Sequence, residues 1–354
     1  MKYSLTTCYL CLYILLSQAV YGADSLSDRF VSLAIQGRLG PARNLLEAAE
    51  SGGSLPEQDL ARRFRARFID RTESLSPNSG SPLVDDIVSA YRAYWIDALM
   101  NEAAQQTAAS ELQDALAASL RAHGWPLAAE ADTDQLQRVL AEAIRANGLY
   151  GLSDRAPPLQ DLLLWSDQSE SRYEVALTDQ LRPVAVRFLS NFFSQGWKHY
   201  AALGLATTSG WIQDGMLYCV HHAYDPGTEA FEVSYLKHET RHLADAEQFS
   251  GLPAVDLEYR AKLTELAFAS ATLRGLLEEF TVRSALNSEA PHAEANHRVT
   301  HDLYLELYGR PFPGNSDAWM TLNSTKVNRV ARRLLQRDSR RRSAENGYDG
   351  TGGD

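Results

Sequence analysis

The sequence predicts an α+β fold in which helices predominate. Apolar residues recur at helical spacing through most of residues 24–150, and they alternate with polar or small residues between about 173 and 220. From Glu229 onward the helical pattern returns. With 354 residues, of which 45% are hydrophobic, the chain is long and apolar enough for a sizeable core, which excludes a wholly disordered protein.

The first 22 residues have the features of a secretory signal peptide. Lys2 precedes an apolar stretch through residues 10–16, and small residues follow at Gly22 and Ala23. The stretch is short for a membrane anchor, so we expect cleavage after Gly22. The sequence therefore predicts a periplasmic or secreted protein that has no transmembrane segment once the signal is removed.

Signal cleavage also decides the cysteine chemistry. Cys8 and Cys11 lie within residues 1–22, so Cys219 alone remains in the mature sequence. An intramolecular disulfide is then impossible, although the expected compartment is oxidising. Stability must come from a packed core.

Residues 23–156 are predicted to form a helical N-terminal region without a fixed repeat. Breaks between its helices are expected at residues 51–53, at 76–80 and at Pro126. Pro157-Pro158 and the polar run 166–172 are interpreted as the boundary to the next domain. Helical spacing is clearest at Val84, Ile87, Val88, Tyr91, Tyr94, Trp95, Ala98 and Leu99, and at Leu136, Val139, Leu140 and Ile144.

A small sheet is predicted at the start of the second domain, residues 173–342. Residues 173–177 and 184–188 alternate as strands do, with a turn near Asp179-Gln180. Two further strands are expected on either side of Asp214-Gly215, which is a typical hairpin-turn dipeptide. Between the two hairpins a helix is expected to include Phe192, Phe193 and Trp197.

Helices are expected from Glu229 to the end of this domain. Phe231, Val233 and Tyr235 also alternate, so a strand that runs into the first helix is an alternative there. The last twelve residues, 343–354, contain four glycines and are predicted to be disordered.

The most informative segment reads His238-Glu239-Thr240-Arg241-His242. On a helix, residues four apart lie one turn along the axis and about 40° around it. Both imidazoles can therefore reach one zinc ion, with Glu239 beside the open coordination position. Thr228 or Ser234 could cap the start of such a helix, and Gly251-Leu252-Pro253 would end it.

The motif resembles that of the zincin metallopeptidases, over about residues 207–280. In that superfamily a sheet precedes the motif helix, and its edge strand holds an extended peptide by strand addition. The resemblance implies a zincin-like core, in which the strands within 210–220 have that role. It departs from the zincin pattern at Arg241, because zincins generally have uncharged residues between the two histidines.

A third protein ligand is needed if one coordination position is to stay open for water. Asp245 and Gln248 occupy the positions at which a three-histidine zincin would continue its motif. The pattern looks more like the gluzincins, in which a glutamate of the following helix completes the site. We expect that ligand to be Glu258, after an N-cap at Asp256, with Glu265 and Asp245 as alternatives.

Asp245 has a second possible role, because it shares a helix face with His238 and His242. A carboxylate there could accept an imidazole N–H and orient a ligand, or it could simply be solvated. Tyr259, His297 and His301 are candidate donors to an oxyanion, but neither they nor His221-His222 are assigned a role.

These residues predict a secreted or periplasmic zinc-dependent hydrolase, most simply a metallopeptidase. Zinc would activate a water molecule and Glu239 would act as general base on a peptide or protein substrate. The alternative is a non-catalytic envelope protein with a structural metal site and a helical partner-binding region. Arg241 and the large N-terminal region motivate that alternative.

The charge of the chain argues against nucleic acid as a partner. The 34 basic and 45 acidic residues give a formal net charge of −11, and sequence-independent binding to phosphate backbones requires a basic surface. Seven arginines between 329 and 342 are basic enough to contact an anionic membrane or nucleic acid. A solvated helix end that balances an acidic body is the simpler interpretation.

Overall fold

A computed structural model describes residues 13–16, 25–50, 52–249, 251–286 and 291–348. It is α+β with helices in the majority, as the sequence predicts. The chain forms two compact units. The helical unit comprises residues 13–169 and 189–209, and the motif unit comprises 170–188 together with the described residues from 210 onward.

Helices make up most of the helical unit, and the breaks between them include 52–53, 76–80 and Pro126, within the segments predicted. The side chains of Ser25 and Asp132 cap α1 and α6 by accepting a backbone N–H of the first turn. The helical elements are α1 Leu26–Ile35, α2 Leu39–Glu50, α3 Leu55–Phe64, the π-helix η1 Arg65–Ile69, α4 Pro82–Met100, the 3₁₀ turn η2 Glu102–Ala104, α5 Gln105–Ala122, α6 Thr133–Ala146 and α7 Gly196–Ala201.

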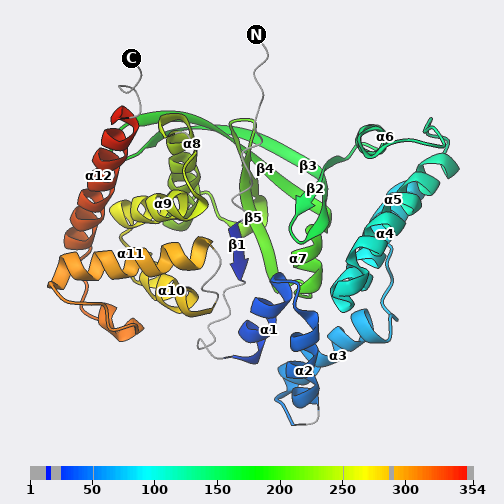
Figure 1. Ribbon diagram of the computed structural model, residues 1–354, viewed down its shortest axis with the longest axis horizontal. Helices are drawn as coiled ribbons and strands as arrows, with labels where there is room; N and C mark the ends of the chain where they lie inside the picture. Colours follow the sequence, from blue (N-terminus) through cyan, green and yellow to red (C-terminus); the bar gives the residue numbers. More distant parts are fainter. Residues whose placement is uncertain (1–12, 17–24, 51, 250, 287–290, 349–354) are drawn as a thin grey trace. The chain divides into compact units, whose positions relative to one another are not determined.

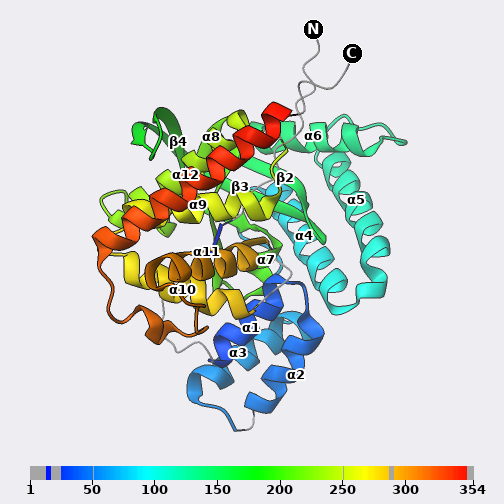
Figure 2. The same cartoon turned by 60° about the vertical axis from the view of Figure 1, so that its left-hand side comes forward.

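The core of the helical unit is built around α4. Tyr91 and Trp95 are fully or almost fully buried, as the helical spacing predicts, and the indole N–H of Trp95 donates to the carbonyl of Gln160 at 2.9 Å. Figures 1 and 2 both show α4 and α5 lying side by side. This packing gives the unit its own hydrophobic core.

One sheet has the strand order β1-β5-β6-β4-β3-β2. Both predicted hairpin turns are confirmed. Leu177 N–H donates to Gln180 O at 2.8 Å in the first, and Asp214 and Gly215 have positive φ in the second. The strands are β1 Tyr13–Leu16, β2 Tyr150–Ala156, β3 Leu159–Ala176, β4 Leu181–Gln195, β5 Ala206–Gln213 and β6 Met216–Val220. The other residues of the predicted signal peptide lie outside the described part of the chain.

Strands β3 and β4 are longer than predicted, and β4 corrects one expectation. The polar run 166–172, interpreted as the domain boundary, lies inside β3 with most of its side chains exposed, and the division between the two units falls within it, between residues 169 and 170. Phe192 and Phe193, expected in a helix, lie in β4, and only Trp197 belongs to α7. The pattern misled because a strand that is exposed over several residues needs no buried apolar face, while ladder pairing still holds it extended.

Helices return in the motif unit from Glu229 onward as predicted, and the alternative of a strand at 231–235 is wrong, because these residues are π-helical. The predicted disordered tail is wrong for residues 343–348, since α12 continues to Tyr348, and its residues 349–354 lie outside the described part of the chain. The helical elements are η3 His221–Ala223, η4 Ala230–Lys237, α8 His238–Gln248, α9 Ala254–Phe268, α10 Leu273–Leu286, α11 Pro291–Tyr308, η5 Ser316–Trp319 and α12 Ser324–Tyr348. Figures 1 and 2 both place α12 next to α9, against which it packs.

One carboxylate joins the start of η4 to the corner between α9 and α10. Glu229 accepts the backbone N–H groups of Ser270, Ala271 and Thr272 at 2.7–3.1 Å, and the hydroxyl of Thr272 at 2.7 Å. Partial burial works to raise the pKa of Glu229, but these hydrogen bonds outweigh it and lower the pKa to about 2. The ionised carboxylate therefore stabilises the native corner.

Replacing Glu229 by Gln should lower the free energy of unfolding by about 1–3 kcal/mol at pH 7, because three or four hydrogen bonds to a charged group are weakened. The native pKa lies below the ordinary value near 4.5, so this stabilisation is present above pH 4.5 and is lost as the pH falls towards 2. Urea denaturation at pH 7 and pH 3 measures it. Glu278→Gln, in an exposed pair with Arg274, is the control, and equal losses in both variants would contradict the assignment.

Gly210 allows close contact between β5 and η4. A Cβ atom at this position would lie 2.5 Å from Tyr218 O and 2.5 Å from Cε2 of Tyr235, closer than packed atoms approach. The glycine therefore makes room for the Tyr235 ring one turn before the histidine motif.

Gly210→Ala should destabilise the protein by about 1–3 kcal/mol through overpacking. Gly275→Ala is the matched control, because Gly275 lies in α10 with nothing within 4 Å of its Cβ position. That substitution should stabilise by about 0.5–1 kcal/mol. Chemical denaturation measures the free energy of unfolding of both variants, which should fall for Gly210→Ala and rise for Gly275→Ala. A change of the same sign in both variants would refute the steric explanation.

Candidate metal centre

The histidine motif begins where η4 passes into α8. Thr228 Oγ1 accepts the N–H of Phe231 at 3.3 Å, although the N-cap position of η4 is Glu229, one residue later, and Ser234 lies within η4. Phe231 and Tyr235 stack on one another with ring centroids 5.6 Å apart. Short π-helical segments often occur at functional sites.

The structure brings together His238, His242 and Glu258. The two histidines lie one turn apart on α8, and Glu258 comes from α9, which packs against α8. All three side chains are at least 95% buried. One possible ligand atom from each of the three side chains lies within 4.8 Å of the other two. No other group of three or more histidine, cysteine or acidic side chains among the described residues meets this condition.

The distances within this group suit a tetrahedral zinc ion. The Nε2 atoms of the histidines are 3.0 Å apart, His242 Nε2 is 3.3 Å from Glu258 Oε1, and His238 Nε2 is 3.7 Å from Glu258 Oε2. Zinc bonds of 2.0–2.1 Å in tetrahedral geometry separate neighbouring donors by about 3.3 Å. The donor set, two imidazoles and one carboxylate, is also one that zinc accepts with a fourth position free for water.

Glu265, the alternative third ligand, contacts the other side of the His238 ring. Its Oε1 lies 2.7 Å from His238 Nδ1. A carboxylate at Nδ1 selects the tautomer whose Nε2 lone pair faces His242 and Glu258. Burial also lowers the pKa of His238 well below its usual range, which keeps the ring neutral and able to bind a cation.

Glu258 is ionised although it is almost completely buried. Burial alone would raise its pKa, but the nearby His292 and His242 hold the pKa well below its ordinary value. His292 Nδ1 lies 2.8 Å from Glu258 Oε2, and Lys262 Nζ lies 4.0 Å from the same oxygen. The site therefore offers a fixed negative charge to a cation.

Glu239 is buried beside this group, and no hydrogen bond to either carboxylate oxygen is found among the described residues. Burial raises the pKa of Glu239 to about 8, against an opposing effect of His242. Burial likewise raises the pKa of Cys219 to about 12, with Glu239 adding to the shift, so the thiol stays protonated. Burial raises the pKa of Glu265 to about 8 as well, but Glu265 contacts His238 Nδ1, so Glu239 is the carboxylate left for base catalysis near neutral pH.

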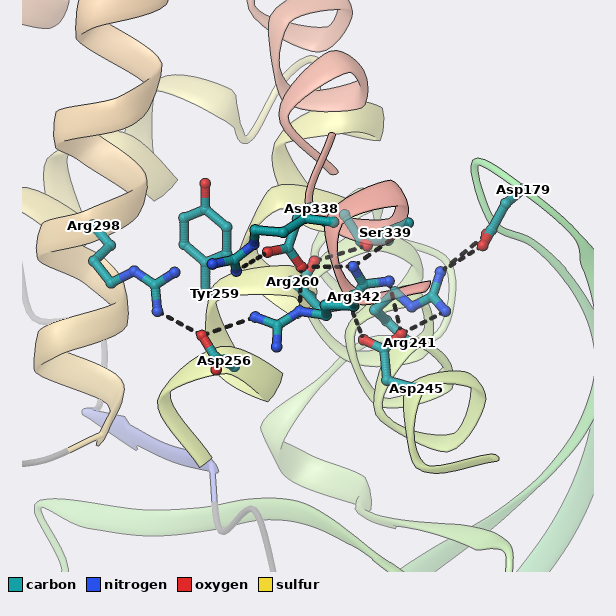
Figure 3. Close-up of polar contacts among 12 residues, drawn as sticks. Asp179, Arg241, Asp245, Asp256, Tyr259, Arg260, Arg298, Asp338, Ser339 and Arg342 are labelled. Carbon is teal, nitrogen blue, oxygen red and sulfur yellow. Dashed lines mark hydrogen bonds and ion pairs between the residues drawn. The ribbon is translucent and has the colours of Figure 1, made fainter. Parts of the chain in front are cut away.

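Arg241, the departure from the zincin pattern, points away from the candidate ligands. Its guanidinium lies 3.0 Å from Asp179 in the β3–β4 turn and 2.7 Å from Asp245 (Figure 3). Lys237 and Glu247 also contact this hairpin, through Ala176 O and Arg182. One face of the motif helix thus bears the ligands and another holds the hairpin.

Two expected roles are wrong. Asp245 accepts no imidazole N–H, because both its oxygens pair with Arg260, at 2.8 and 2.9 Å, and one of them with Arg241. Asp256 is not the N-cap of α9, since Pro253 holds that position and Asp256 lies in the first turn, where it pairs with Arg298 and Arg342. In both cases a nearby arginine offers a charged partner, which binds a carboxylate more strongly than a neutral N–H does.

The other candidates lie outside the group. The hydroxyl of Tyr259 donates to Asp302 at 2.8 Å, and His297 and His301 stack on one another on α11. His221 and His222 lie in η3, where His221 contacts the ring of Phe188. None of these residues belongs to the three-residue group found in the described part of the chain.

His292 is the site neighbour that sequence reasoning missed. It lies in the first turn of α11, 34 residues after Glu258, and its side chain is 41% exposed. Neither spacing nor hydrophobic pattern relates it to the motif. Lys262, one turn after Glu258, is a partner of that carboxylate that the i,i+4 spacing predicts.

Comparisons with protein-family models, with curated proteins and with solved structures found no match for this chain. The site must therefore be interpreted from its own geometry.

Comparing zinc binding by Glu258→Gln and by Glu265→Gln should show which glutamate binds the metal directly. We expect Glu258→Gln to abolish stoichiometric zinc binding in competition with a micromolar chelator, because it removes a donor. Glu265→Gln should retain one zinc with affinity lowered by about tenfold, since it touches zinc only through His238. The reverse order of losses would make Glu265 the ligand. Glu294→Gln, at an exposed position of α11, is the control and should bind as the wild type does.

Proposed function

We propose that this protein is a zinc-dependent hydrolase, and that its substrate is a peptide or protein. The observation that carries the proposal is the convergence of His238, His242 and Glu258 at tetrahedral donor distances. Glu239, from the same motif, lies buried beside them. Three protein donors leave a position for water, as catalytic zinc sites require.

Each residue of the site would have a separate role in hydrolysis. Bound zinc would act as a Lewis acid and lower the pKa of a water molecule to about 7. Glu239 would take the proton of that water and pass it to the leaving amine. Glu265 holds the ring of His238 in place, and the negative charge of Glu258 partly neutralises the cation.

The sheet supports the choice of a peptide substrate. β5 lies between β6 and β1 in the strand order, and β1 belongs to the predicted signal peptide. Removal of that segment would leave β5 with an unpaired edge. An extended peptide can add to such an edge through backbone hydrogen bonds, with little dependence on its sequence.

Secretion or periplasmic export is part of the same proposal and rests on residues 1–22. The helices within the described ranges include none that is both long and apolar enough to cross a membrane.

Glu239→Gln should retain about one zinc per chain and lose hydrolysis by about 10²–10⁴-fold, because the variant keeps the donors but lacks a base. Metal analysis and cleavage of fluorescein-labelled casein and of quenched-peptide libraries measure the two properties. Glu232→Gln, at an exposed site in η4, is the matched control. Hydrolysis by Glu239→Gln at the wild-type rate, or a folded wild-type protein that binds no zinc, would refute the proposal.

One observation favours the second candidate, a non-catalytic protein with a structural metal. His292 Nδ1 lies 2.8 Å from Glu258 Oε2 but outside the group of donors that lie within 4.8 Å of one another, so a movement of its side chain towards the two histidines would let it supply a fourth donor and close the site to water. His292→Gln decides between the two. A catalytic site should keep its zinc in this variant, whereas a structural site should lose it and the parent protein should show no hydrolysis.

A further inference from the structure

Eight charged residues of the motif unit form a single chain of alternating sign. We call it the ionic chain, and Figure 3 shows its members between α8, α9, α11, α12 and the β3–β4 turn. In order, they are Asp179, Arg241, Asp245, Arg260, Asp338, Arg342, Asp256 and Arg298. Four acids alternate with four arginines, and Arg341 adds a side contact to Asp338 at 2.7 Å.

Every link of the ionic chain is a close contact. The seven shortest nitrogen–oxygen distances between neighbours run from 2.7 to 3.0 Å. The central members, Arg241, Asp245 and Arg260, are fully buried, and only the ends, Asp179 and Arg298, reach solvent appreciably. Buried charges of this kind persist only when each has a partner in good geometry.

Each of the candidate ligands His242 and Glu258 lies between two members of the ionic chain along its own helix. His242 is flanked on α8 by Arg241 and Asp245, and the central link from Asp245 to Arg260 crosses from α8 to α9. Glu258 is flanked on α9 by Asp256 and Arg260. The ionic chain therefore fixes α9 at positions two residues from Glu258, and α8 at positions one and three residues from His242.

We propose that the ionic chain positions the metal ligands, by fixing the register of α8 against α9 at which His242 meets Glu258. The proposal deepens the proposed function and rests on the metal site described there. A shift of either helix by one residue would separate Asp245 from Arg260 and leave buried charges unpaired. Apolar packing tolerates small shifts much better, since it has no such directional requirement.

The ionisation of the members agrees with this arrangement. Burial would raise the pKa of Asp338, but hydrogen bonds from Arg342, Arg260 and Arg341 outweigh it and keep the pKa below its ordinary value. Partial burial would also raise the pKa of Asp256, but hydrogen bonds from Arg298 and Arg342 outweigh it and lower the pKa. Both carboxylates thus remain charged throughout the neutral range.

The double variant Asp245→Leu/Arg260→Met tests register against stability. It removes the central link and leaves two balanced pieces, Asp179 with Arg241, and Asp338 with Arg342, Asp256 and Arg298. Replacing a buried ion pair by apolar residues is often neutral for stability. We expect a Tm near that of the wild type and a zinc affinity at least about tenfold lower, measured by chelator competition well below the Tm.

The surface pair variant Arg274→Gln/Glu278→Gln, on α10, is the control and should change neither quantity. A folded double variant that binds zinc as tightly as the wild type would overturn the positioning role. Absence of zinc from the folded wild-type protein is a different result, and it would overturn the proposed function together with the positioning role that rests on it.

Asp179→Asn provides a second test if the double variant fails to fold. Asp179 is 40% exposed at the outer end of the chain, so its loss should leave the fold intact. It leaves Arg241 with Asp245 as its one partner in the ionic chain, and the zinc affinity should fall several-fold at an unchanged Tm. Unchanged affinity in this variant would overturn the proposal.

Discussion

Buried charge is the constraint on which the motif unit depends. Helices α8 and α9 pack together through faces that carry ionisable groups rather than through a purely apolar seam. A buried charge is costly unless an oppositely charged or hydrogen-bonding partner meets it in good geometry. The buried ionisable residues before the turn between the two helices are Lys237, His238, Glu239, Arg241, His242 and Asp245, and those after it are Glu258, Arg260, Lys262 and Glu265. The turn between the helices, and the elements around them, must satisfy all of these groups at once.

The two faces of the motif helix meet this constraint in different ways. On one face, arginine and aspartate satisfy one another through the ionic chain. On the other face, His238, His242 and Glu258 converge, and the three groups all offer lone pairs to the same small volume. Lone pairs that converge in a buried site are best satisfied by a cation, which is why this face suggests a metal and the other does not.

The parts of the site that could be predicted from the sequence are those set by local spacing. The placement of His238, Glu239 and His242 on a helix follows from the i,i+4 rule, and Glu258 follows from the length of the turn after that helix. Glu265 was recognised as a candidate ligand, but its contact with His238 Nδ1 depends on how two helices cross. His292 and the partners of Asp245 come from α9, α11 and α12, and no periodicity within one segment reports such contacts.

The fold shows the same division. Hairpin turns at Asp179-Gln180 and Asp214-Gly215 and the helices of the N-terminal region were predictable because turn chemistry and helical spacing are local. The extent of β3 and β4 was not, since exposed strand residues carry no alternation, and ladder pairing with a neighbouring strand decides their conformation.

The π-helical segment η4 makes the chain sensitive to length changes just before the motif. Its turns are wider than those of α8, although the two form one continuous helix. Because i→i+5 bonding fits more residues into each turn than i→i+4 bonding, one deleted residue within Ala230–Lys237 would be absorbed by a return to α-helical bonding. A second deletion would rotate all that follows by about 100° around the axis. His238 and His242 would then turn away from Glu258, while Phe231 would keep its contacts with Tyr173 and Phe188. The segment therefore sets the rotational phase between the aromatic anchor and the ligands, and a lineage that loses two residues here should lose the metal site with them.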